Sequence, residues 1–182
     1  MPRAIGAMNI FRSVFFALLA LFVAKKHWAA LFIVMPRVEG FRSPCDKTIG
    51  GLHHLGRMFD KIRLMQAGML PEQYHRNYGL GIGLDGQLCG FLGVSFAEIE
   101  AQVKAGGTDE EVAEWIFSRG FRPNRMQTQV WNEYSRKLGW NDRMAGFIAK
   151  VKQEAGLTNH PACTSFELID LGEEREPPAM RS

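Results

Sequence analysis

The sequence predicts an all-α, mainly helical fold: one compact domain of five or six short helices, with one short C-terminal strand in addition. Three observations predict it. Apolar residues recur at spacings of three and four from Cys45 onward, capping residues and glycines bracket these segments, and no long run of β-branched residues occurs. With 182 residues, 46% hydrophobic and 23% charged, the chain is long enough for one domain with a sizeable core.

The first helix is expected over residues 52–67, just before a glycine and a proline that end it. Its apolar residues share one face: Leu52, Leu55, Phe59 and Ile62. The polar, glycine-rich stretch 73–86 that follows is expected to be a loop. The apolar segment 87–94 after it is long enough for one or two helical turns.

Two capping boxes mark the starts of the next two helices. In a capping box, a Ser or Thr side chain accepts from the backbone N–H three residues on, and a Glu at that position reaches back. Ser95 with Glu98 and Thr108 with Glu111 have this spacing. Each helix is expected to end at the glycines that follow it.

Asparagine and glycine bracket two further helices. One begins at Pro123-Asn124 and ends at Gly139, and the next is capped by Asn141 and closed by Gly156. Their apolar residues have helical spacing: Met126, Val130, Tyr134 and Leu138 in the first, then Met144, Phe147, Ile148 and Val151, which are expected to face inward. The alternating segment 165–171 is expected to be a short edge strand, and residues 176–182 a frayed tail.

The positive charge of the chain lies in its first 34 residues. The whole chain carries +3, yet residues 1–34 hold four basic residues and no acidic one, which leaves 18 basic against 19 acidic residues in the rest. A nucleic-acid-binding domain keeps its basic excess on the folded body, where it neutralises phosphates. Nucleic acid is therefore not an expected partner.

Residues 1–34 form an apolar N-terminal extension with three interpretations. A membrane anchor over residues 10–34 is the first, but its longest uncharged run has 12 residues before Lys25 and Lys26. That run makes about 18 Å of helix, against about 30 Å of hydrocarbon. The second is a secretory signal with a poor cleavage site. The third is a mis-assigned start, with translation beginning at Met35, where the Met-Pro-Arg of the chain start is repeated.

The cysteines bear on the compartment. Cys45, Cys89 and Cys163 cannot all pair within one chain, and no C-x-x-C motif occurs. Free thiols are typical of a reducing compartment, so the cytoplasm is the expected location. A membrane partner is expected only if residues 1–34 are translated.

No cofactor and no metal ion is expected, and no catalytic residue is assigned. Gly81-x-Gly83-x-x-Gly86 matches the dinucleotide fingerprint by letter, but no buried strand precedes it and no βαβ pattern surrounds it, which favours a tight loop. His53 and His54 are adjacent and diverge on a helix, and no metal-ligand spacing accompanies them.

The densest group of charges on one predicted helix has four members: Arg57, Asp60, Lys61 and Arg63. Asp60 is three residues from both Arg57 and Arg63, a spacing that allows ion pairs on one face of a helix. Such pairs on a solvated face would give the group a structural role only. The functional alternative is an anion-binding face, to which Arg76 or Asn77 from the following loop would contribute.

A longer pattern contains these charges. It reads Ser43-Pro44, Ile49-Gly50-Gly51 and L-x-R-M-x-D-K-x-R from Leu55, followed later by Leu84-Asp85, Phe91-Leu92-Gly93 and Phe166-Glu-Leu-Ile-Asp-Leu. The pattern resembles a bacterial family catalogued as domain of unknown function 5069, from residue 35 to about 175. Gly56 stands where that family would have proline. The resemblance implies a small helical fold and no activity, and it makes six polar residues the ligand-binding candidates: Arg57, Asp60, Lys61, Arg63, Asn77 and Asp85.

Two functions follow from these residues. The favoured one is a non-enzymatic cytoplasmic module that binds an unknown small molecule or protein in a groove between helices. The alternative is an enzyme acting on an anionic small molecule, with Arg57, Lys61 and Arg63 as the anion clamp and Asp60 or His54 as the acid-base group. The enzyme requires these groups to converge on one pocket, whereas a binding module does not. Either would be membrane-tethered if the N-terminal extension is translated.

Overall fold

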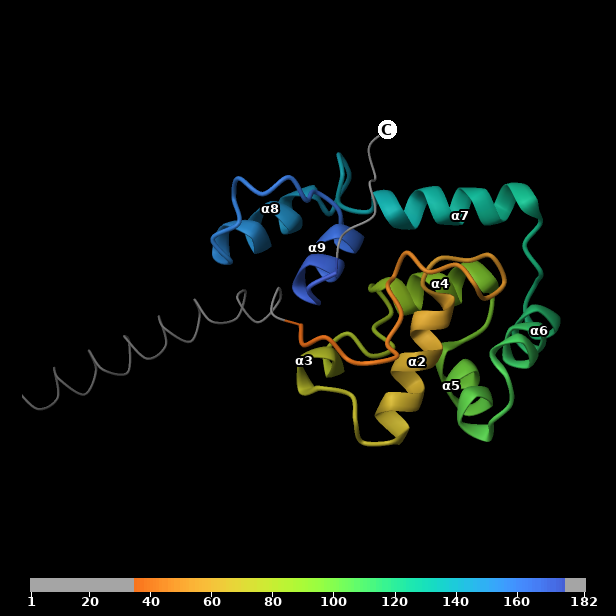
Figure 1. Ribbon diagram of the computed structural model, residues 1–182. Helices are drawn as coiled ribbons and strands as arrows, with labels where there is room; N and C mark the ends of the chain where they lie inside the picture. Colours follow the sequence, from red (N-terminus) through yellow and green to blue (C-terminus); the bar gives the residue numbers. More distant parts are fainter. Residues whose placement is uncertain (1–34, 176–182) are drawn as a thin grey trace, which may run out of the picture.

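The computed structural model describes residues 35–175, and this part of the chain is helical. The predicted N-terminal extension and C-terminal tail, residues 1–34 and 176–182, lie outside the described residues. Residues 35–175 contain eight helices and no strand (Figure 1): α2 Leu55–Gln66, α3 Glu72–His75, α4 Leu84–Leu92, α5 Phe96–Ala105, α6 Asp109–Arg119, α7 Arg125–Lys137, α8 Ala145–Glu154 and α9 Ser165–Gly172. The all-α class is confirmed, whereas the expected count of five or six helices was too low.

The segment expected to be a strand is helix α9. Thr164 and Glu167 form a full capping box: Thr164 Oγ1 accepts from the Glu167 N–H at 3.2 Å, and Glu167 Oε2 accepts from the Thr164 N–H at 2.9 Å. The strand prediction was wrong because an alternating pattern over seven residues also fits two helical turns. The T-x-x-E pattern that begins at Thr164 is a helix-start signal and indicates the helix.

Backbone conformation explains the other differences in helix bounds. α2 begins at Leu55 rather than at residue 52, because His54 has a left-handed conformation with φ 73° that cannot continue a helix. The expected cap residue Asn141 is also left-handed, with φ 55°. The N-cap residue of α8 is Met144, with no side-chain cap; the Asp142 carboxylate instead holds the preceding turn by accepting from the N–H groups of Gly139 and Met144 at 2.8 and 2.7 Å.

The expected loop 73–86 is partly helical, since it contains most of α3 and the start of α4. Its glycine motif is a tight turn: a Cβ on Gly86 would lie 2.3 Å from the Gly81 backbone. The capping boxes expected at Ser95 and Thr108 are both present, at the starts of α5 and α6.

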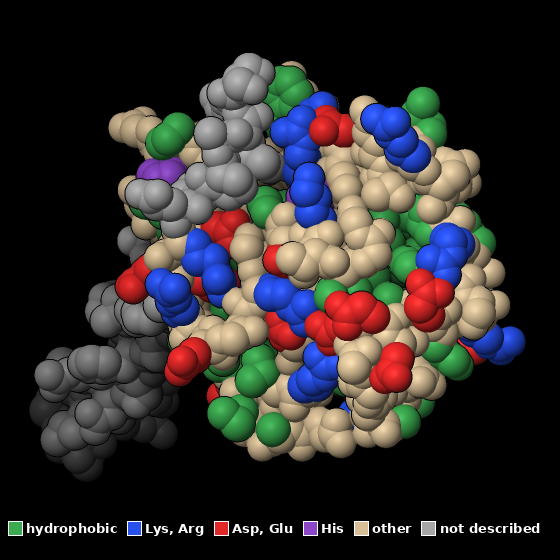
Figure 2. Space-filling view, turned by 45° about the vertical axis from the view of Figure 1, so that its right-hand side comes forward, with side chains coloured by type: hydrophobic (Ala, Val, Ile, Leu, Met, Phe, Trp, Pro, Cys, Tyr) green, Lys and Arg blue, Asp and Glu red, His purple; other side chains and the backbone are tan. Residues whose placement is uncertain are grey.

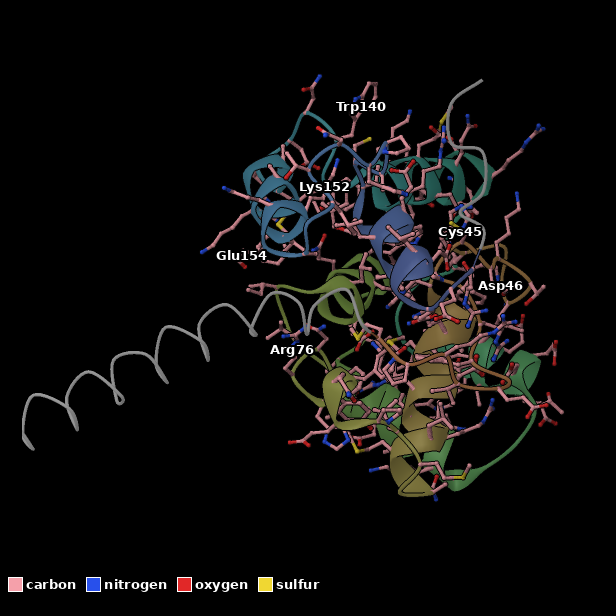
Figure 3. The ribbon with its side chains drawn as sticks, turned by 60° about the vertical axis from the view of Figure 1, so that its left-hand side comes forward. Cys45, Asp46, Arg76, Trp140, Lys152 and Glu154 are labelled. Carbon is pink, nitrogen blue, oxygen red and sulfur yellow. The ribbon has the colours of Figure 1, made fainter. Side chains whose placement is uncertain are left out.

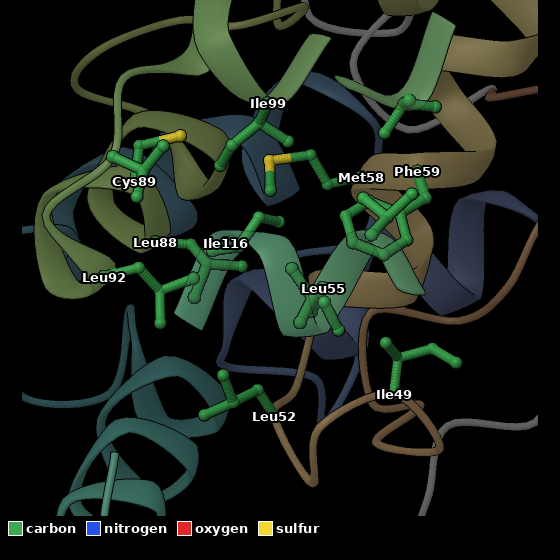
Figure 4. Packing of buried hydrophobic residues seen from close by; sticks show 14 of the residues in the cluster. Ile49, Leu52, Leu55, Met58, Phe59, Leu88, Cys89, Leu92, Ile99 and Ile116 are labelled. Carbon is green, nitrogen blue, oxygen red and sulfur yellow. The ribbon is translucent and has the colours of Figure 1, made fainter. Parts of the chain in front are cut away.

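The core surrounds α2, which lies between α4, α5 and α6 (Figure 1). Figure 4 shows its side chains interdigitating with those of the neighbouring helices. The fully buried members are Leu55, Met58, Phe59 and Ile62 from α2, with Leu88, Leu92, Ile99 and Ile116 from the helices around it. Burying each such side chain contributes about 1.5–3 kcal/mol before entropy losses, so α2 anchors the domain.

Helix α7 crosses one end of this core (Figure 1), and three of its apolar residues are exposed to solvent. Met126, Val130 and Tyr134 are 66%, 57% and 44% exposed, whereas Trp131 and Ser135 are buried. The helix therefore packs on the core through Trp131 and Ser135, each one residue after a residue of the predicted apolar face. α8 and α9 form a smaller cluster of their own through Ile148, Val151, Ala162 and Leu168.

Candidate functional site

Two of the α2 charges, Arg57 and Lys61, point into the protein and not to solvent. Arg57 and Lys61 are buried, with only 3% and 5% of their surface exposed. Buried charges persist only where they are paired and hydrogen-bonded. Each charged residue of the group finds its own partner in another segment: Arg57 binds Glu173, Asp60 binds Arg42, Lys61 binds Asp85 and Arg63 binds Asp109.

Lys61, Asp85 and His54 form a buried triad between α2 and α4. Lys61 Nζ donates to both Asp85 oxygens at 2.8 Å, and His54 Nε2 donates to Asp85 Oδ1 at 2.9 Å. The carboxylate also accepts from the Gly79 N–H at 2.9 Å. Gly79 has φ 62°, and a Cβ there would lie 2.6 Å from the Phe96 ring, so the loop can approach Asp85 this closely only with glycine.

The triad keeps Asp85 ionised and His54 neutral. Burial alone would raise the pKa of Asp85, but the charge of Lys61 and the hydrogen bond from His54 hold it below its usual range. Burial lowers the pKa of His54 to about 4, against the opposing effect of Asp85. Because the ionised carboxylate only accepts, His54 carries its proton on Nε2, and its Nδ1 is buried with no hydrogen-bond partner among the described residues.

Glu173 is the centre of a second buried network. Arg57 donates to both of its oxygens, Tyr74 donates its hydroxyl proton to Oε1 at 2.8 Å, and Arg175 Nε donates to Oε2 at 3.0 Å. The Arg57 guanidinium also lies 3.8 Å from the centroid of the Phe41 ring. This network joins the end of α9 to α2, α3 and the loop before α2.

The third network is nearer the surface. Arg42 donates to Asp60 through Nε at 2.8 Å and Nη2 at 2.5 Å, and the same Nη2 lies 2.8 Å from Asp109. Arg63 reaches Asp109 at 2.6 Å and is 38% exposed. A Cβ on Gly56 would lie 2.6 Å from Arg42 Nη1, so the glycine at this point of α2 gives the guanidinium room.

The six candidate residues thus do not converge on one site. Lys61 and Asp85 are brought together, Arg57 belongs to the Glu173 network, and Asp60 and Arg63 meet only through Asp109 and Arg42. Asn77 lies half-buried in the turn after α3. None of the six lines the hollow formed by residues 37–46, 170 and 175 or the hollow between residues 47–53 and α7.

A hollow does lie beside the networks, and we call it the loop–α9 hollow. It has a volume of about 800 Å³, within the range of small-molecule sites, and is open to solvent. Its walls are the loop 37–46 and the end of α9; Figure 3 shows Cys45 and Asp46 on that loop beside α9. The lining has three basic and three acidic residues, so it carries no net charge: Arg37, Arg42 and Arg175, with Glu39, Asp46 and Asp170.

Asp170 is the unusual residue of this hollow. It is 1% exposed, and its Oδ2 accepts from the Ser43 hydroxyl at 2.9 Å. Its Oδ1 is buried and accepts no hydrogen bond from any described residue; the nearest cation, Arg175 Nε, is 3.8 Å away. Burial raises the pKa of this carboxyl. A buried carboxylate oxygen without a donor costs free energy, which a ligand that donates to it would recover.

The thiol in the same hollow is a poor nucleophile. Burial and the nearby Asp170 raise the pKa of Cys45 to about 12, so the thiol stays protonated at neutral pH. Within residues 35–175, no three His, Cys, Asp or Glu side chains are placed to share a metal ion. The chemistry present in the loop–α9 hollow is therefore hydrogen bonding and charge pairing.

Sequence reasoning missed the residues of this hollow. Asp170 was placed on an expected strand, where alternate residues would have faced solvent. Arg42 and Arg175 stand far from the α2 group in sequence and carry no motif. One signal was available: Ser43 and the segment 166–171, which contains Asp170, both belong to the pattern that resembles the family. Ser43 and Asp170 are 127 residues apart, so only the fold brings them together.

A comparison with protein-family models shows the family of this chain. The model described as "Domain of unknown function (DUF5069)" matches residues 38–175. The chain belongs to the DUF5069 family. The matched part ends at Arg175 and contains the three charge networks and every lining residue of the loop–α9 hollow except Arg37. The comparison with curated proteins found no match.

Proposed function

We propose that this DUF5069 protein is a non-enzymatic module that binds a small zwitterionic molecule in the loop–α9 hollow. The observation that carries the proposal is Asp170, a lining residue of the hollow whose Oδ1 is buried and accepts no hydrogen bond within residues 35–175. A ligand amino group would donate to this oxygen. The ligand's anionic end would face Arg37, which is exposed and forms no ion pair with a described residue.

The charge of the hollow supports a ligand with no net charge. Its three basic and three acidic side chains balance, so neither a polyanion nor a polycation is favoured. Figure 2 likewise shows acidic and basic side chains interspersed on one face of the molecule, which does not favour a nucleic-acid partner. The three free cysteines support the cytoplasm as the location.

The arrangement of the α2 charges supports binding over catalysis. An enzyme using Asp60 or His54 would need that residue to line a pocket together with the basic groups. His54 is instead 2% exposed and bound to Asp85, and Asp60 is bound to Arg42.

No helix of residues 35–175 has the length and hydropathy needed to span a bilayer.

Calorimetric titration with free amino acids tests the proposal. Glycine betaine is the matched probe, because it carries the same two charges but has no N–H to donate to Asp170. At least one amino acid of a panel of small zwitterions should bind, and betaine should bind about tenfold more weakly or not at all. Failure of every amino acid to bind would contradict the proposal, and so would equal binding of betaine.

A pair of variants assigns the binding to Asp170. Asp170→Asn keeps the shape of the side chain and an acceptor for Ser43, but it places an NH₂ group or a neutral oxygen at the ligand position. Glu110→Gln is the control, since it removes the same charge from an exposed residue of α6. Binding should fall about tenfold or more in the first variant and stay unchanged in the second. Equal affinity of the two variants would refute the role of Asp170.

A further inference from the structure

A second hollow is lined by a later part of the loop before α2 and by α7, and we call it the α7 hollow. It has a volume of about 540 Å³ and lies between the loop 47–53 and the first three turns of α7. It shares no lining residue with the loop–α9 hollow. Its size lies within the range of small-molecule sites, so it is large enough to hold a ligand of its own.

The lining of the α7 hollow has an excess of positive charge. It contains three basic residues and one acidic residue: Lys47, Arg125, Arg136 and Glu133. Glu133 is already bound, because Arg136 donates to its two oxygens at 2.9 and 2.6 Å and Lys137 lies 2.6 Å away. Lys47 and Arg125 form no ion pair with any residue of 35–175. Two cations in the hollow are thus left without a counter-charge.

Hydrogen bonds fix the loop to the helix, so the hollow is preformed. Asn132 of α7 donates through Nδ2 to the Gly51 carbonyl at 2.8 Å and accepts from the His53 N–H at 2.8 Å. Trp131 donates through Nε1 to the His53 carbonyl at 3.0 Å. A site held in place in this way loses little conformational entropy when a ligand binds.

Two further features favour an anion in this position. Arg125 is the first residue of α7, a helix of 13 residues whose N-terminus carries a partial positive charge. His53, also in the lining, has a lowered pKa because of burial and because of the charges of Lys47 and Arg136. Lys47 and Arg136 therefore act on a titratable group inside the hollow, and an anion bound there would be attracted to the same charges.

We propose that the α7 hollow binds the phosphate group of a small phosphate monoester. A phosphate monoester carries about −1.5 to −2 charges at pH 7, which matches the two unpaired cations Lys47 and Arg125. The Thr128 hydroxyl in the same lining is available as a neutral donor to a phosphate oxygen. Binding here uses none of the residues of the zwitterion site, so either proposal can fail without the other.

The test uses glycerol 3-phosphate as the probe, followed by ¹H–¹⁵N NMR and by calorimetric titration of the whole chain. Glycerol and sodium sulfate serve as comparison probes. We expect glycerol 3-phosphate to shift the amide signals of residues 51–53 and 125–132, and glycerol to shift none. Equal weak binding of sulfate and glycerol 3-phosphate, only at salt-like concentrations, would mean an adventitious ion only and would overturn the proposal.

A pair of double variants separates a site from general electrostatics. Lys47→Gln with Arg125→Gln removes two exposed cations of the hollow, whereas Arg143→Gln with Lys150→Gln removes two exposed cations elsewhere. Both double variants lower the net charge by the same amount. The first should weaken glycerol 3-phosphate binding about tenfold or more, and the second should leave it within about twofold. Equal affinity of the two double variants would overturn the proposal, as would no binding to the wild type.

Discussion

Replacing Lys61 by methionine tests whether the α2 charges hold the fold together. Lys61 is 5% exposed and its Nζ lies 2.8 Å from both oxygens of Asp85, which is 1% exposed. Lys61→Met keeps the aliphatic stem but leaves the carboxylate buried without its cation. Removing one partner of a buried ion pair costs about 3–5 kcal/mol. Because His54 and Gly79 still donate to Asp85, we expect the lower end of this range.

Lys104→Met is the matched control for this experiment. Lys104 pairs with Glu100 one helical turn away, and its side chain is 40% exposed, so its loss should change the free energy of unfolding by no more than about 0.5 kcal/mol. Urea denaturation followed by circular dichroism gives both values, with the slope showing whether the folded state is intact. A cost for Lys61→Met as small as that of the control would refute a structural role for the pair.

Two more predictions concern buried His54 and two glycines. Folding stability should fall as the pH drops from 6.5 towards 4, because the unfolded chain takes up the His54 proton near its ordinary pKa of 6.5 and the folded chain only near 4. The difference between the two pKa values corresponds to about 3 kcal/mol of folding stability. Urea denaturation at several pH values measures it, and a His54→Asn variant that loses stability with pH as steeply as the wild type would contradict the prediction. Gly120→Ala should lower the melting temperature strongly, since its Cβ would lie 2.0 Å from the Leu92 carbonyl oxygen. Gly90→Ala, in open space inside α4, should raise stability by about 0.5–1 kcal/mol; a similar loss for both variants would show that the close approach at residue 120 is not the cause.

Local signals in the sequence were sufficient for most helices. The capping boxes at Ser95 and Thr108 were found because all their groups lie within four residues. The same signal at Thr164 was passed over in favour of an alternating pattern, and this produced the false strand. The left-handed conformation of His54 has no signal of its own, since a non-glycine residue adopts it only when the surrounding structure imposes it.

The charge networks could not be read from the sequence, because their partners are distant along the chain. Arg57 pairs with Glu173, which is 116 residues away, and Asp60 pairs with Arg42, which is 18 residues away. From the sequence, spacings of three suggested pairing within α2 on a solvated face. The fold buries Arg57 and Lys61 instead, so each requires a partner from another segment. The loop–α9 hollow is likewise lined by the loop before α2 and the end of α9, which lie far apart along the chain.

The most direct test of the account is native mass spectrometry of the untagged protein isolated from its own source. The account predicts a bound small molecule that is released on denaturation, and its absence from an Asp170→Asn protein isolated in the same way. A wild-type protein that carries no bound molecule would contradict a ligand site in the loop–α9 hollow. The same bound mass in the Asp170→Asn protein would contradict it equally.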